Sequence, residues 1–334
     1  MFKPFSTTGI GSLPHTDPDE ACGLILRGFD IPFWPQLPKL SFLESMITQF
    51  SEGMPFIKID HERNVIYVER DASDELERFY ETYKDDSRIA ISEDYAQGFY
   101  GFLRAIRARR FSALKGHVTG PLTFTLGLKD SEGRLLYFDE ELRQISLMLL
   151  QAKARWQIDQ LRHSADEVVI FVDEPILSAV GSTAYLGVSV EESSRLLKEI
   201  ADAIRNSGGI PGIHCCGNAD WPMVIGSGFG ILSFDAYHHF ENLFIFHAEV
   251  TGFLESGGYL AWGIIPTTEH IVEESPESIA NTFQERLDVL SKRVPRNTLL
   301  SRSLLTPSCG TGSRTITETI KVFQLLLRLR EEFA

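Results

Sequence analysis

The sequence predicts a (β/α)8 barrel, formed by a single domain over residues 1–334. The first observation is the length of 334 residues, since a barrel of this kind needs roughly 250 residues and leaves room here for insertions. The second is an alternation of short apolar runs with longer segments of helical period. The third is that polar residues able to bind metals or substrates follow directly after those apolar runs. Together these observations favour one barrel over two smaller domains.

Eight short runs rich in apolar and β-branched residues are expected to form the barrel strands. The segments between them repeat apolar residues at three- and four-residue steps, as amphipathic helices do, most clearly over 142–162, 190–204 and 279–290. Alternating strands and helices indicate a parallel sheet, and eight such units close a barrel. The expected strands cover 5–11, 31–36, 113–118, 167–172, 210–215, 230–235, 259–264 and 299–306.

One segment departs from this alternation. Residues 55–70 contain two short strand-like runs separated by the polar stretch HERN, which is typical of a β-hairpin. We expect this hairpin to be an insertion after the second barrel strand.

The composition excludes several classes of partner. Of the residues, 43% are apolar and 23% charged, and the formal net charge is -14, so a basic surface for nucleic acid is not expected. A membrane span is not expected either, because the chain contains no apolar run of the necessary length. The N-terminus lacks the pattern of a signal peptide, and four cysteines in 334 residues do not form a disulfide scaffold. We therefore expect a cytoplasmic protein.

The strongest local signal is the motif GIHCCGN at 212–218. His214 and Cys216 alternate along an extended segment, so their side chains can point to the same side, whereas Cys215 faces the opposite way. Cys309 follows another predicted strand, and the carboxyl ends of barrel strands meet at one face. Imidazole and thiolate are good zinc ligands, so these three residues predict a catalytic zinc site. Asp235, at the end of the intervening strand, could add a carboxylate oxygen.

Two further groups of residues lie at predicted strand ends. Asp173 follows the apolar run VVIFV and is expected to bind an ammonium group or another hydrogen-bond donor of a substrate, although a carboxylate there can also cap a helix. His238 and His239 follow Asp235, where they could act in proton transfer or simply belong to a loop.

Five motifs in order resemble the catalytic domain of cobalamin-independent methionine synthase, and more broadly its superfamily with uroporphyrinogen decarboxylase and corrinoid:thiol methyltransferases. They span the whole chain and read TTGIGSLPHT at 7–16, LKGHVTGPLTF at 114–124, VDEPIL at 172–177, IHCCGN at 213–218 and TPSCGTGSR at 306–314.

The resemblance implies a (β/α)8 barrel with a zinc ion held by His214, Cys216 and Cys309. It further implies that the loop containing Ile10 and Ser12 binds the carboxylate of an amino acid, and that Asp173 binds its amino group. The family's additional zinc ligand is a glutamate, which Asp235 would replace. Gln36 stands near the place of a second family glutamate that contacts the amino acid, so the identity of the thiol does not follow from the resemblance.

The resulting expectation is a zinc-dependent methyltransferase of methionine biosynthesis or a related pathway. It would transfer a methyl group to a small thiol such as homocysteine, with a methyl-corrinoid protein or a methyl-folate as donor. Zinc lowers the pKa of a bound thiol and leaves a nucleophilic thiolate at neutral pH. Two alternatives stay open: a zinc-binding or thiol-binding accessory protein of a corrinoid system without turnover, and a decarboxylase of the uroporphyrinogen type.

Overall fold

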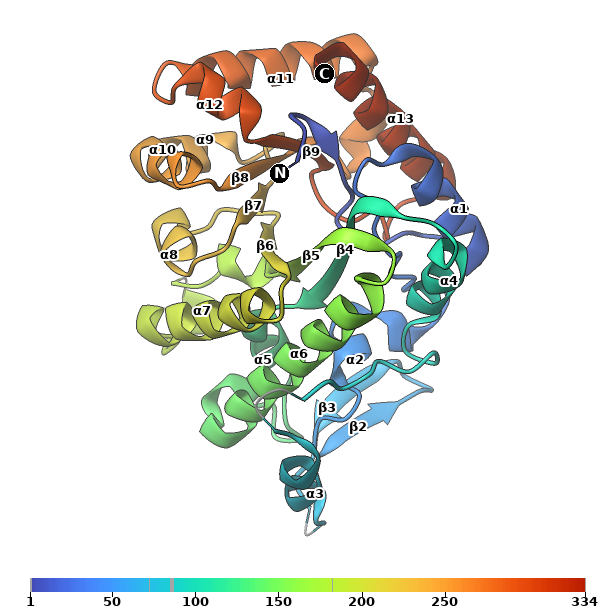
Figure 1. Ribbon diagram of the computed structural model, residues 1–334. Helices are drawn as coiled ribbons and strands as arrows, with labels where there is room; N and C mark the ends of the chain where they lie inside the picture. The colour runs from blue at the N-terminus through green and yellow to red at the C-terminus, as the bar shows by residue number, and fades with distance from the viewer. Residues whose placement is uncertain (1, 72, 85–86, 182, 334) are drawn as a thin grey trace.

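Parallel strands form the wall of a barrel, and helices surround it (Figure 1). The computed structural model describes residues 2–71, 73–84, 87–181 and 183–333. Within these residues the main sheet holds seven strands in the order β1-β9-β8-β7-β6-β5-β4, and every neighbouring pair is parallel. The (β/α)8 class predicted from the sequence is confirmed. The strands are β1 (Ser6–Thr7), β4 (Phe111–Thr119), β5 (Ala165–Asp173), β6 (Ile210–Cys215), β7 (Ile231–Phe234), β8 (Tyr259–Ile265) and β9 (Ser303–Pro307).

Residues 31–36 occupy the eighth position of the barrel wall, between β1 and β4. The amide of Ile31 donates to the carbonyl of Thr7 at 3.0 Å, and the amide of Lys115 donates to the carbonyl of Pro32 at 2.8 Å. The segment joins its neighbours only by isolated bridges within the described residues, and not by a regular ladder. Its sequence, IPFWPQ, explains this, because Pro32 and Pro35 have no amide hydrogen to donate.

The helical periods of the sequence correspond to helices of the outer layer. The three clearest segments form α6 (Glu140–Leu161), α7 (Val190–Asn206) and α11 (Pro276–Ser291), each starting at a side chain that accepts a hydrogen bond from the first turn. The other helices are α1 (Pro18–Gly28), α2 (Met46–Ser51), α3 (Glu75–Thr82), α4 (Gln97–Ile106), α5 (Pro121–Gly127), α8 (Trp221–Gly226), α9 (Phe240–Ile245), α10 (His247–Glu255), α12 (Arg296–Ser301) and α13 (Ile316–Phe333).

The predicted hairpin within 55–70 is present as β2 (Ile57–Asp60) and β3 (Val65–Val68), which pair antiparallel. Asn64 adopts a left-handed conformation in the turn, with φ of 52°. At the end of β3 the amide of Val68 donates to the carbonyl of Lys129 at 2.9 Å. The hairpin is therefore attached to the segment that follows α5.

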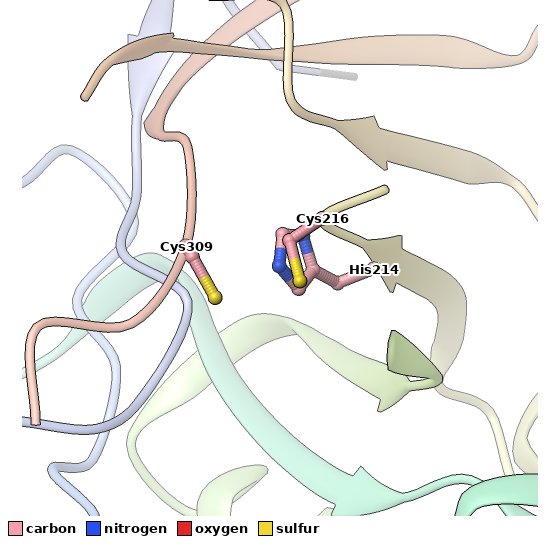
Figure 2. A group of neighbouring side chains, drawn as sticks. All are labelled: His214, Cys216 and Cys309. Carbon is pink, nitrogen blue, oxygen red and sulfur yellow. The ribbon is translucent and has the colours of Figure 1, made fainter. Parts of the chain in front are cut away.

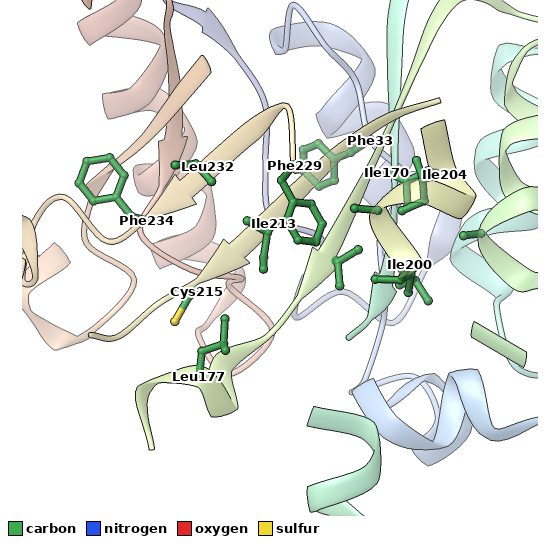
Figure 3. Packing of buried hydrophobic residues seen from close by; sticks show 14 of the residues in the cluster. Phe33, Ile170, Leu177, Ile200, Ile204, Ile213, Cys215, Phe229, Leu232 and Phe234 are labelled. Atoms are coloured by element: carbon green, nitrogen blue, oxygen red, sulfur yellow. The ribbon is translucent and has the colours of Figure 1, made fainter. Parts of the chain in front are cut away.

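Alternation along the strands divides the buried side chains into two sets. One set fills the space between the sheet and the helices, as Figure 3 shows for Ile213, Leu232 and Phe234. The other set points into the barrel and includes Val169 and Phe171 of β5. Further toward the carboxyl ends of the strands the buried inward positions become polar, at Lys115, His117, Asp173, His214, Ser233 and Thr306. The polar end of an otherwise apolar interior is where a site is expected in this fold.

Among the described residues, none of the helices is both long enough and apolar enough to cross a membrane.

Candidate metal centre

Three residues distant in sequence come together at the carboxyl ends of β6 and β9. His214 lies on β6, Cys216 follows that strand directly, and Cys309 lies two residues after β9. One potential ligand atom of each lies within 4.8 Å of the other two. Figure 2 shows the imidazole and both sulfur atoms directed into the same space. The structure therefore brings together the three side chains expected to bind zinc.

The alternation of β6 separates the two adjacent cysteines. The side chain of Cys215 points away from the barrel interior and packs near Leu177, among the apolar side chains in Figure 3. Burial raises the pKa of the Cys215 thiol to about 12, so it stays protonated at neutral pH. Cys22 is also a buried thiol with a pKa raised to about 12, and its sulfur donates to the carbonyl of Gly98. Both cysteines therefore pack in the hydrophobic core.

The two nitrogens of His214 have different surroundings. Nδ1 lies 3.0 Å from the hydroxyl oxygen of Ser233 on the neighbouring strand. Nε2 is buried and has no hydrogen-bond partner among the described residues. A buried ring nitrogen without a partner is costly unless it binds something, and a metal ion is one group that an imidazole lone pair can bind.

The neighbouring thiols of Cys216 and Cys309 shift each other's pKa in opposite directions. A hydrogen bond from Cys309, together with the neighbouring His214, lowers the pKa of Cys216 to about 4. The same interaction and burial raise the pKa of Cys309 well above its ordinary value. One thiolate, one thiol and one free imidazole nitrogen form a donor set that suits zinc, and metal binding would release the remaining proton.

Asp173 ends β5, where it pairs in register with His214. It is 8% exposed, and its Oδ1 is buried without a partner among the described residues. Burial raises its pKa to about 6, while the charge of Lys115 acts in the opposite direction. A buried carboxylate oxygen that lacks a donor is suited to bind a hydrogen-bond donor.

Lys115 was not singled out in the sequence, although a lysine at an inward position of the apolar strand FSALKGHVT is a recognisable signal. Its side chain is fully buried, and Nζ lies 4.5 Å from the centre of the Phe171 ring. Nζ donates to the carbonyl of Ile10 at 2.6 Å, and burial lowers its pKa to about 8. Lys115 thus binds the loop at Ile10, and its charge lowers the pKa of Asp173.

The loop containing Ile10 and Ser12 lies against the loop that carries Cys309. The amide of Thr311 donates to the carbonyl of Ser12 at 2.8 Å, and the amide of Gly312 donates to the Ser12 hydroxyl at 3.3 Å. A Cβ atom at Gly310 would lie 2.1 Å from the Ser12 hydroxyl oxygen, so only glycine allows this contact. The structure therefore places the predicted carboxylate-binding loop beside Cys309, one of the three candidate ligands.

Gln36 lies next to this loop, and its backbone amide donates to the carbonyl of Gly11 at 3.1 Å. Its side-chain nitrogen donates to Oε1 of Gln49 at 2.8 Å, and Gln49 in turn donates to the carbonyl of Tyr95 at 2.7 Å. The side-chain nitrogen of Gln36 is therefore used in a structural chain of amides, and its side-chain oxygen is the part that can face a substrate.

Asp235 does not join the three candidate ligands in this structure, contrary to the expectation from its strand position. Its Oδ1 accepts hydrogen bonds from the amides of Tyr237 and His238, at 3.0 and 2.8 Å. Its Oδ2 lies 2.9 Å from Nδ1 of His238. An aspartate at the start of a turn binds the following amides readily, and here that local role uses both oxygens. His238 is accordingly a partner of Asp235 in this loop.

Glu174 and the turn at Gly120 support the site from outside. Glu174 is fully buried and accepts hydrogen bonds from the amides of Leu122 and Thr123 and from the Thr123 hydroxyl, at 2.9, 2.8 and 2.6 Å. A Cβ atom at Gly120 would lie 2.1 Å from the Glu174 carboxyl group. Glycine at this position therefore leaves room for the carboxyl group of Glu174. Through its hydrogen bonds Glu174 attaches the end of β5 to α5.

Comparisons with known proteins point to the fold. The sequence matches no family model and no curated protein. Among solved structures, a B12-independent methionine synthase from Shewanella sp. W3-18-1, in complex with selenomethionine, superposes with a TM-score of 0.64 at 17% identity, covering 98% of this chain and 97% of that one. A methyltransferase from Methanosarcina mazei superposes with a TM-score of 0.58 at 17% identity, covering 100% and 95%. At such identities these likenesses establish a shared fold over nearly the whole chain.

Proposed function

We propose that this protein is a zinc-dependent methyltransferase that transfers a methyl group from a methyl-corrinoid or methyl-folate donor to a small thiol. The observation that carries the proposal is the convergence of His214, Cys216 and Cys309 within 4.8 Å at the end of the barrel where sites of this fold lie. The two solved structures described above are named as a B12-independent methionine synthase and as a methyltransferase, which agrees with the proposal.

The three residues fit a zinc ion by their chemistry. His214, Cys216 and Cys309 would hold the zinc ion, and the metal would favour the thiolate form of a substrate thiol at neutral pH. The substrate thiolate would attack the methyl carbon, so that a carbon–sulfur bond forms while the donor leaves with the electron pair of the broken bond.

The remaining polar residues orient the thiol substrate. Asp173 offers a buried carboxylate oxygen to an ammonium group or another donor, and Lys115 stabilises its charged form. The loop containing Ile10 and Ser12 is held by Lys115 on one side and by the loop after Cys309 on the other. Positioning the reacting atoms in this way lowers the entropic part of the barrier.

Metal analysis of the purified protein tests the proposal at its first step. We expect about one zinc ion per chain in the wild type, and strongly reduced zinc in Cys309→Ser because one of three protein ligands is lost. Cys215→Ala is the matched control, since it removes the neighbouring thiol that faces away from the site and should keep the zinc. A wild type without zinc contradicts the proposal.

Methyl transfer is then measured with methylcobalamin and methyl-tetrahydrofolate as donors and with homocysteine and other small thiols as acceptors. Product formed by the wild type and lost in Cys309→Ser supports the methyltransferase. Zinc binding and thiol binding without turnover by either donor favour a binding protein of a corrinoid system. Release of carbon dioxide from a carboxylated porphyrinogen by the zinc-free protein would instead favour the decarboxylase.

A further inference from the structure

We propose that Ser233 is the positioning residue of the metal centre, which holds the ring of His214 so that Nε2 faces the metal. This inference rests on the zinc site of the proposed function, and it assigns a role to a residue that the sequence motifs do not include. Ser233 lies on β7, two residues before Asp235, and it is fully buried.

The geometry follows from the register of two neighbouring strands. His214 of β6 and Ser233 of β7 are paired Cα partners in the parallel sheet. Inward positions that are paired in this way place their side chains next to each other, and the Ser233 hydroxyl oxygen lies 3.0 Å from Nδ1 of His214. The contact is inside the barrel, where it does not compete with bulk water.

This contact selects the nitrogen that is free to bind a metal ion. A neutral imidazole carries its hydrogen on one ring nitrogen and a lone pair on the other. When Nδ1 donates its hydrogen to the Ser233 hydroxyl, the lone pair is on Nε2, the nitrogen that has no partner among the described residues. Partners of this kind fix the tautomer and the ring orientation of histidine ligands.

The use of Asp235 by the following turn strengthens this assignment. One oxygen of Asp235 accepts hydrogen bonds from the amides of that turn, and the other contacts the ring of His238. The carboxylate of Asp235, which follows β7 directly, is therefore used within its own loop. Ser233 is therefore the residue of β7 that contacts a candidate metal ligand.

Zinc affinity of Ser233→Ala, measured by competition with a chromophoric chelator, tests the inference. We expect the dissociation constant to rise by about 10- to 100-fold, as is typical when the partner of a histidine ligand is lost. Ser233→Thr restores a hydroxyl and should recover most of the affinity. In the cobalt-substituted protein, Ser233→Ala should keep the thiolate charge-transfer bands, because both cysteines are present, but should need more cobalt to develop them.

Ser303→Ala is the matched control. Ser303 is also a fully buried serine on a barrel strand, and its hydroxyl accepts a hydrogen bond from the ring N–H of Trp262 at 2.9 Å. It begins β9, at the end of the barrel away from Cys309. The same loss of a buried hydroxyl should therefore leave zinc affinity unchanged, even if it lowers stability.

The outcomes separate this inference from the proposed function. A wild type that binds zinc tightly together with a Ser233→Ala variant of equal affinity would overturn the role of Ser233 and leave the zinc site intact. Equal weakening in Ser233→Ala and Ser303→Ala would also overturn it, since the effect would then be one of general stability. A wild type that binds no zinc would overturn both proposals.

Discussion

Replacement of Glu174 by alanine should destabilise the protein through the buried amides that it leaves without a partner. The carboxylate accepts from the amides of Leu122 and Thr123, and both residues are buried. Each unsatisfied buried amide costs about 1–3 kcal/mol, and each lost methylene about 0.8 kcal/mol. We therefore expect Glu174→Ala to lower the free energy of unfolding by about 4 kcal/mol at pH 5.

The pH dependence of this loss has a definite sign. Burial raises the pKa of Glu174 from 4.5 to about 7. Between these values the folded protein keeps a proton that the unfolded chain has released, so the stability that the residue contributes is lost as the pH rises. A shift of this size corresponds to about 3 kcal/mol, and the cost of Glu174→Ala should therefore be smaller at pH 8 than at pH 5. Asp173 and Glu44 also have raised pKa values, but their contributions remain in the variant and cancel in the difference.

Urea denaturation of the metal-free wild type and variant at pH 5 and pH 8 measures both effects. Glu318→Ala is the control, because Glu318 accepts from the amide and hydroxyl of Thr315 in the same manner but is only partly buried. Water can replace those contacts, so little change is expected. A loss in Glu174→Ala no larger than in Glu318→Ala at pH 5, or a loss that grows with pH, would refute the reasoning.

Three further predictions concern the metal centre. Asp235→Asn should keep zinc affinity within about threefold, because its oxygens are used by the following turn; a loss of tenfold or more, of the size expected for a ligand or its direct partner, would make Asp235 part of the zinc site. In the metal-free protein at pH 6, Cys216 should react with iodoacetamide before the other thiols, since its pKa is lowered to about 4, and peptide mapping that finds another cysteine alkylated first would contradict this. Asp173→Asn should raise the KM for the thiol by about 10-fold or more without changing the zinc content, because it weakens a charged hydrogen bond to the substrate. An unchanged KM would exclude a substrate-binding role for Asp173.

Much of the barrel could be predicted because its elements depend on local periodicity. The apolar runs and helical periods are properties of neighbouring residues, and so is the alternation that puts His214 and Cys216 on the same side of β6. The second strand was located correctly, but its weak pairing depends on the prolines that interrupt it.

The contacts between strands could not be predicted in the same way. The pairing of Ser233 with His214 depends on the register of two strands separated by a helix, and register is a property of the folded sheet. The end of a strand is a position from which Asp235 could add an oxygen to the metal site. In the folded protein the amides of the following turn donate hydrogen bonds to its carboxylate. Lys115 could be recognised as a buried charge, but its contact with Ile10 depends on the packing of β4 beside the first two strands of the folded sheet.

The pairing of β1 with β9 has a consequence for the order of folding. These strands come from opposite ends of the chain, and the loops beyond them are joined by the contact between Ser12 and Thr311. Contacts between residues so far apart in sequence form late, because a long loop must close first. Cys309 follows β9, so the full set of three candidate ligands exists only once β9 has joined the sheet beside β8. Zinc would then bind the folded state selectively and stabilise it by mass action, and its coordination would report that the last strand has joined the sheet.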